Sequence, residues 1–293
     1  LNGLSVIVKR IVELVGIYSA DNSSFLAALL RIVERLLLTF GSEDRMRNLG
    51  ESALFDALEK IMSGEFASTV VRGHAYAITA AFIHNEPTSL SVLQERRVPQ
   101  ALIDSVCRNI DVDGDLVAGL MLAFGATCLN SEGERYFVDK NPLHGYLNVF
   151  QNPDFAKPIA QHGNAAIMGQ AMDEFIRHHP NLKDICYNEL RGLINRFAEV
   201  LVSTEDVWKP CGGKFDDPIK TTSEAPKPDL NKKPPTSQQS TMLENLCVFL
   251  EPIFMNEQHV KPLLDGETIT ALWKCVSSSG LPSSFLSSPA FYS

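Results

Sequence analysis

The cysteines and histidines of this chain are the residue types whose spacing would first indicate catalysis or metal binding. The chain has six cysteines and seven histidines: Cys107, Cys128, Cys186, Cys211, Cys247, Cys275, His74, His84, His144, His162, His178, His179 and His259. They form no C-x-x-C pair, no H-E-x-x-H motif and no zinc-type Cys/His spacing. We therefore predict no catalytic residue, no metal site and no cofactor, and we leave the substrate-binding residues unassigned.

Five of the cysteines lie in apolar patterns typical of helices, where a free thiol packs as a small hydrophobic group. Cys211 lies instead in a proline-rich stretch, and we expect it to be the only exposed thiol. A flexible stretch would hold no base beside Cys211, so we do not expect nucleophilic catalysis there. Reduced thiols at such wide spacing are typical of a cytosolic or nuclear protein.

The acidic run D-V-D-G-D at residues 111–115 has a chemical and a structural interpretation. Its glycine comes two positions too early for a calcium loop, and Leu122 stands where the bidentate glutamate belongs. Capping of the following helix by Asp113 or Asp115 is the favoured interpretation.

Two further motifs also have simpler explanations than chemistry. His178 and His179 precede Pro180 where one predicted helix ends, so interaction with the helix dipole is favoured over metal binding. The G-G-K run at 212–214 lacks the first glycine and the Ser/Thr of a phosphate loop, so we interpret it as part of a linker.

The charge and hydropathy of the 293 residues exclude two classes of partner. The net charge is −9, and the basic pairs at 9–10, 96–97 and 232–233 are scattered, so we interpret them as solvated helix faces and expect no nucleic-acid binding. The longest nearly apolar stretch, 116–129, is shorter than the roughly 20 residues that span a bilayer, so we predict a buried helix and no membrane association.

Apolar residues recur at helical spacing along most of the chain, which predicts an all-α fold. We expect helices near 4–15, 25–40, 51–62, 68–83 and 182–201, with Gly41 ending the second and capping boxes starting at Ser131 and Thr241. The buried stripe predicted for the second helix consists of Phe25, Leu29, Ile32, Val33, Leu36, Leu37 and Phe40.

A weak repeat indicates how these helices are arranged. The spacing of Pro99, Ile103 and Val106 recurs at Pro142, Tyr146 and Val149, a step of 43 residues, and a similar pattern follows Gly266. This period is typical of armadillo/HEAT-like helical repeats, so we predict a solenoid; an irregular helical bundle is the alternative. Gly119 and Gly125 would let neighbouring helices approach closely.

The repeats divide into two parts around a proline-rich segment. Residues 204–239 contain six of the 16 prolines, so we predict a flexible loop or linker there. We expect armadillo-like repeats at 1–203 and further helices that continue the solenoid at 240–293.

Three stretches carry a family resemblance: YAITAAFIHNEP at 76–87, CLNSEGERYFVDKNP at 128–142 and QAMDEFIRHHPNLK at 170–183. Together they resemble the N-terminal armadillo-like region of the giant HECT-type E3 ubiquitin ligases of the Mule/ARF-binding protein/Tom family. The M-D-E-x-x-R-H-x-P-x-L run at 172–182 is the most specific part. As a helix it would place Met172, Phe175 and Ile176 inward, and Asp173, Glu174 and Arg177 outward.

The resemblance implies a non-catalytic scaffold or substrate-binding segment of a long ligase in the cytoplasm or nucleus. A distant C-terminal HECT domain, absent here, would transfer the ubiquitin. The implied partners are protein substrates of ubiquitination and neighbouring solenoid segments of the same long chain. The alternative is an armadillo-type transport or tethering adaptor, whose groove typically carries ladders of tryptophan; this chain has only Trp208 and Trp273.

Overall fold

The computed structural model describes residues 2–41, 49, 52–64, 67–203 and 237–276. Within these ranges every regular element is an α-helix or a short 3₁₀ turn, and no strand occurs. The prediction of an all-α fold is therefore confirmed.

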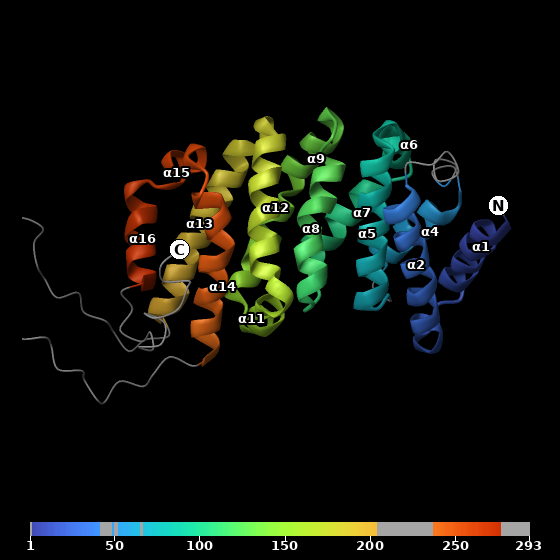
Figure 1. Ribbon diagram of the computed structural model, residues 1–293, viewed down its shortest axis with the longest axis horizontal. Helices are drawn as coiled ribbons and strands as arrows, with labels where there is room; N and C mark the ends of the chain where they lie inside the picture. The colour runs from blue at the N-terminus through green and yellow to red at the C-terminus, as the bar shows by residue number, and fades with distance from the viewer. Residues whose placement is uncertain (1, 42–48, 50–51, 65–66, 204–236, 277–293) are drawn as a thin grey trace, which may run out of the picture.

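The long helices form two rows. The α2 row, whose members stand side by side in Figure 1, consists of α2 (Ala20–Phe40), α5 (Thr69–Asn85), α8 (Gly114–Thr127), α12 (Asn164–His178) and α14 (Ser237–Phe254). The α1 row consists of α1 (Asn2–Gly16), α4 (Leu54–Ser63), α7 (Val98–Arg108), α10 (Pro142–Asn148), α13 (Lys183–Ser203) and α16 (Gly266–Val276). Each helix contacts the next member of its own row, which is the stacking that defines a helical-repeat solenoid.

Shorter elements connect the rows. They are α6 (Leu90–Glu95), α9 (Ser131–Lys140), α11 (Pro153–Ala160) and α15 (Glu257–Leu263), with 3₁₀ turns at Pro87–Ser89, Val149–Gln151, Gln161–Gly163 and Pro180–Leu182. The predicted domain boundaries within 204–239 stay predictions, because residues 204–236 lie outside the described part of the chain.

Side-chain bonds between successive layers repeat the interval found in the sequence. Arg72 donates two hydrogen bonds to Asp111, Gln94 and Asn130 exchange a pair, and the Asn164 amide donates to Asp115. The partners are 39, 36 and 49 residues apart, close to the 43-residue step. This confirms the prediction of helical repeats.

The helix starts match the sequence in one place and differ in two. Asp113 caps α8 as predicted, because its carboxylate accepts from the backbone amides of Asp115 and Leu116 at 3.0 and 3.1 Å. The capping box at Ser131 is wrong, since the Asn130 side chain caps α9 by accepting from the Gly133 amide. Thr241 does not start a helix as predicted, because α14 has already begun at Ser237.

Helix α8 is buried on most sides, as its apolar sequence predicts. Phe124, near the end of α8, contacts the rings of Phe137 and Tyr146 edge-on, with centroids 5.4 and 6.0 Å apart. Leu122 is an exception, because 61% of its surface is exposed.

Other glycines, and not the predicted ones, let helices approach. A Cβ atom on Gly119 would meet nothing within 4 Å, and one on Gly125 would make only ordinary contacts. A Cβ on Gly169 would instead overlap the backbone carbonyl of Phe249, where α12 packs on α14. A Cβ on Gly133 would likewise overlap the backbone carbonyl of Thr127.

The buried stripe predicted for α2 is only partly right. Val33 and Leu37 are buried, but the rest of the buried face consists of Leu26 and Leu30. Phe25, Ile32 and Phe40 are 50%, 44% and 44% exposed. Helix α2 therefore has two apolar faces, and periodicity alone could not show which of them is buried.

Candidate functional site

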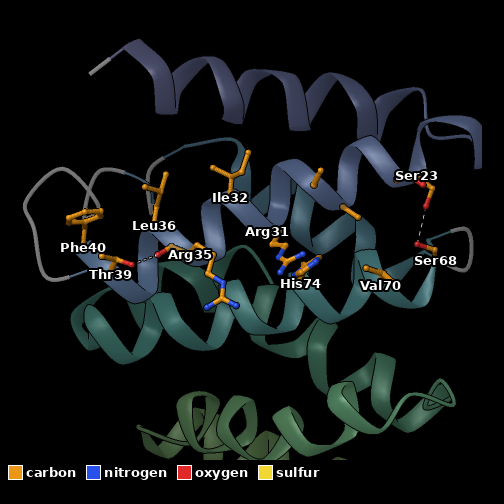
Figure 2. A pocket seen from close by; sticks show the side chains of 13 residues that line it. Ser23, Arg31, Ile32, Arg35, Leu36, Thr39, Phe40, Ser68, Val70 and His74 are labelled. Carbon is orange, nitrogen blue, oxygen red and sulfur yellow. Dashed lines mark hydrogen bonds between the residues drawn. The ribbon is translucent and has the colours of Figure 1, made fainter. Parts of the chain in front are cut away.

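An open groove with a volume of about 810 Å³ lies over α2 and the first turns of α5 (Figure 2). We call it the α2–α5 groove. Its lining consists of Ser23, Ser24, Ala27, Ala28, Arg31, Ile32, Arg35, Leu36, Thr39, Phe40, Ser68, Val70 and His74.

The groove has an apolar side and a cationic side along α2. Ile32, Leu36 and Phe40 recur at helical spacing and point away from α5 in Figure 2. Arg31 and Arg35 are one turn apart, are exposed, and lie on the side toward α5. Such a surface can hold an apolar and an anionic group side by side.

An acid on the same helix as these arginines, Glu34, is already engaged. The Oε2 atom of Glu34 lies 2.6 Å from Nδ1 of His74, so this carboxylate bridges α2 and α5. Among the described residues no ion pair involves Arg31 or Arg35. The two guanidinium groups therefore keep their donors available.

Hydroxyl groups hold the end of the groove together. Tyr18 donates to Ser23 and Ser23 donates to Ser68, at 3.1 and 3.0 Å, while the Ser68 amide donates back to Tyr18. Burial raises the pKa of Tyr18, but these hydrogen bonds outweigh it and lower the pKa below its usual value. None of these bonds reaches His74, so this set of described residues contains no nucleophile–base pair.

The acidic run at 111–115 does not form a calcium site. Asp111 is held by Arg72, Asp113 caps α8, and Asp115 accepts from Asn164. The three carboxylates thus face different partners. More generally, the described residues contain no cluster of three His, Cys, Asp or Glu side chains suited to a metal ion.

The two adjacent histidines differ in role. His178 lies in the last turn of α12, and for this residue the dipole interpretation stays a prediction. His179 is buried and lies against the Phe175 ring with centroids 4.7 Å apart. Burial lowers its pKa and favours the neutral form, so for His179 the dipole explanation is wrong.

The family-specific run at 172–182 has a structural role that the sequence only partly predicted. Met172, Phe175 and Ile176 are buried, as predicted. Asp173 does not face solvent as predicted, because it accepts a hydrogen bond from the side chain of His259 on α15 at 3.0 Å.

His259 is the centre of a buried cluster that no sequence motif indicated. It is 1% exposed, and its Nδ1 atom lies 2.9 Å from the hydroxyl of Tyr187 on α13. Because Nε2 donates to Asp173, Nδ1 accepts from Tyr187. Arg177 and Asn256 also donate to Asp173, and together these bonds lower its pKa although burial raises it. The cluster joins α12, α13 and α15.

One thiol is exposed that the sequence predicted to be packed in a helix. Cys107 is exposed, and its pKa is raised chiefly by partial desolvation and then by Asp104. Burial raises the pKa of Cys128, Cys186 and Cys275 to about 12, so these thiols are inert. Cys211 and the G-G-K run lie outside the described residues.

The basic pairs also differ from one another. Arg10 pairs with Glu13 on the exposed face of α1, as predicted. Arg96 is not part of a solvated helix face, because it donates to the Ser52 carbonyl at 3.0 Å. Arg97 has a left-handed backbone (φ 61°) at the turn into α7. The pair at 232–233 and Trp208 lie outside the described residues.

Comparison with known proteins places the chain among very long relatives. It is 30% identical over 282 residues to "E3 ubiquitin-protein ligase ptr1" of Schizosaccharomyces pombe, covering 94% of this chain and 8% of the relative. It is 29% identical over 175 residues to "E3 ubiquitin-protein ligase TOM1" of Saccharomyces cerevisiae, covering 59% and 5%. With "E3 ubiquitin-protein ligase HUWE1" of Mus musculus the identity is 24% over 172 residues, covering 56% and 4%.

The chain thus spans less than a tenth of the length of these curated relatives. They confirm the resemblance to the Tom/Mule ligases that the three sequence stretches indicated. None of the described helices combines the length and the apolarity that a membrane span requires. A family model described as "Domain of Unknown Function (DUF913)" matches residues 9–284, and the chain belongs to this family.

Proposed function

We propose that this chain is a non-catalytic, substrate-binding segment of a HECT-type E3 ubiquitin ligase. The observation that carries the proposal is the match of 94% of the chain to 8% of a ligase, ptr1. In this proposal the ubiquitin thioester forms on a distant domain, and the segment contributes a binding surface to the same protein.

The two-row stack supports this role physically. Helical repeats contact only their neighbours, so a stack exposes a long and continuous surface on which other proteins can dock. The α2–α5 groove is one such surface, because apolar and cationic side chains are exposed beside each other there. The adaptor alternative is not favoured, because the relatives are named as ligases.

Neighbouring segments of the same long chain are the second class of partner that we propose. Ile269 on α16 is 52% exposed. An exposed apolar side chain on a helix of the α1 row would be covered by a further helical layer. We assign the protein to the cytoplasm or nucleus and expect no nucleic-acid binding, which imaging of a tagged protein and gel-shift assays would test.

Deletion of this segment from the full-length gene product tests the proposal. We expect the deletion protein to keep forming its ubiquitin thioester and to lose ubiquitination of a subset of substrates. The isolated 293-residue chain, incubated with charged E2, should form no thioester. Equal ubiquitination of every substrate after the deletion would refute the binding role, and a thioester on the isolated chain would refute the non-catalytic assignment.

A further inference from the structure

The cationic side of the α2–α5 groove is unusual in a chain whose net charge is −9. Arg31 and Arg35 stand at i and i+4 on α2, where like charges repel each other and destabilise the helix. Glu34 lies on the same helix but is bound by His74. The repulsion between the two arginines is therefore not relieved by the carboxylate next to them.

We propose that the α2–α5 groove binds an acidic amphipathic helix of a partner protein. The partner helix would lie along α2, with its apolar face on Ile32, Leu36 and Phe40 and its carboxylates on Arg31 and Arg35. The inference rests on the proposed function, since it names the chemistry of a substrate or co-factor protein that this segment recruits.

The dimensions of the groove fit a helix of this kind. Its lining extends along α2 from Ser23 to Phe40, which at 1.5 Å per residue is about 25 Å. A partner helix of roughly 17 residues covers this length. The apolar residues of α2 are spaced four apart, so they can interdigitate with apolar residues of a second helix.

The charge pattern favours carboxylates as the anionic groups. Two arginines one helical turn apart match two acidic side chains at i and i+4 of the partner helix. The guanidinium fork binds a carboxylate through two parallel hydrogen bonds. A nucleic acid is disfavoured, because it would meet the negative field of the whole chain and gain only this one pair of contacts.

A pair of stapled peptides tests the inference directly. The first is a 17-residue fluorescent helix with leucines on one face and four glutamates, in i/i+4 pairs, on the neighbouring flank; the second has glutamine for each glutamate. Binding to the 293-residue chain is measured by fluorescence anisotropy at low and high salt. We expect the glutamate peptide to bind at least tenfold more tightly at low salt, and the difference to shrink at high salt because exposed charges are screened.

Variants of the chain locate the binding. The double variant Arg31→Gln/Arg35→Gln should weaken the glutamate peptide about tenfold and leave the glutamine peptide unchanged. The matched control Lys157→Gln/Lys261→Gln removes the same charge from exposed residues of α11 and α15 and should change neither peptide. Ile32→Ser should weaken both peptides severalfold, because it removes apolar contact from the groove.

Three results would overturn the inference: equal binding of the two peptides, an equal effect of the lysine control, or binding that Ile32→Ser leaves unchanged. A single-stranded RNA that binds Arg31 and Arg35 more tightly than the glutamate peptide would also overturn it. Full-length protein separates this inference from the proposed function. If the arginine variant ubiquitinates all substrates normally while the segment deletion does not, the groove assignment fails and the recruiting role stands.

Discussion

Replacing His259 by alanine tests whether the buried cluster on α12, α13 and α15 holds the later layers of the stack together. The substitution removes the donor to Asp173 and the acceptor of the Tyr187 hydroxyl in one step. It also leaves the 1% exposed site of the imidazole empty.

The structure sets the expected magnitude. A hydrogen bond to a charged group contributes about 1.5–3 kcal/mol, and a buried hydroxyl without a partner costs about 1–3 kcal/mol. Asp173 keeps Arg177 and Asn256 as donors, so the lower ends of these ranges apply. The sum is about 2.5 kcal/mol, and with an unfolding entropy of about 2.1 cal/mol/K per residue this lowers Tm by about 4 °C.

Hydrogen exchange measured by mass spectrometry is the most informative assay, because stability in stacked repeats is local. We expect His259→Ala to speed amide exchange in α15 and in the parts of α12 and α13 that face it, and to leave α2 and α5 unchanged. His178→Ala, an exposed histidine on the same α12, is the matched control and should change nothing. Unchanged exchange in α15, or an equal loss of protection in α2, would refute the reasoning.

Three further predictions concern single positions. Gly169→Ala should destabilise the chain by about 1–3 kcal/mol, because its Cβ would overlap a backbone carbonyl, whereas Gly119→Ala, with open space around it, should stabilise α8 by up to about 1 kcal/mol; urea unfolding measures both. The pKa of Asp173 is lower in the folded state than in the unfolded chain. The Asp173 carboxylate therefore stabilises the fold fully at a pH above the unfolded pKa near 4, and this stabilisation is lost as the pH falls through the folded pKa. Asp173→Asn should therefore flatten the acid limb of a stability–pH profile, and a limb of unchanged steepness would contradict the assignment. Iodoacetamide followed by peptide mapping should label Cys107 before Cys128, because only the former thiol is exposed; the reverse order would be inconsistent with the fold.

Periodicity predicted the helices well because a helix depends on local residues. The helix starts were harder to place, since several residues near a helix start can act as the cap. Asn130, and not Ser131, caps α9 because its side chain reaches the Gly133 amide. The 43-residue step was visible because each layer reuses the same packing positions.

The candidate site could not be located from the sequence, because it depends on which of two apolar faces of α2 is buried. Leu30 and Ile32 are equally suited to a core, and only the positions of the neighbouring helices decide that Leu30 is buried and Ile32 exposed. The His259 cluster was hidden for a related reason: its partners Asp173 and Tyr187 are 86 and 72 residues away along the chain.

The extensive contacts of each described helix are with elements next to it along a row or across the two rows. A mechanical pull applied between α1 and α16 must therefore pass through every intervening layer in turn. Layers in series all carry the same force, so the least stiff junction between two layers extends the most. One junction, between α5 and the turn that precedes α8, is also bridged by the ion pair of Arg72 and Asp111.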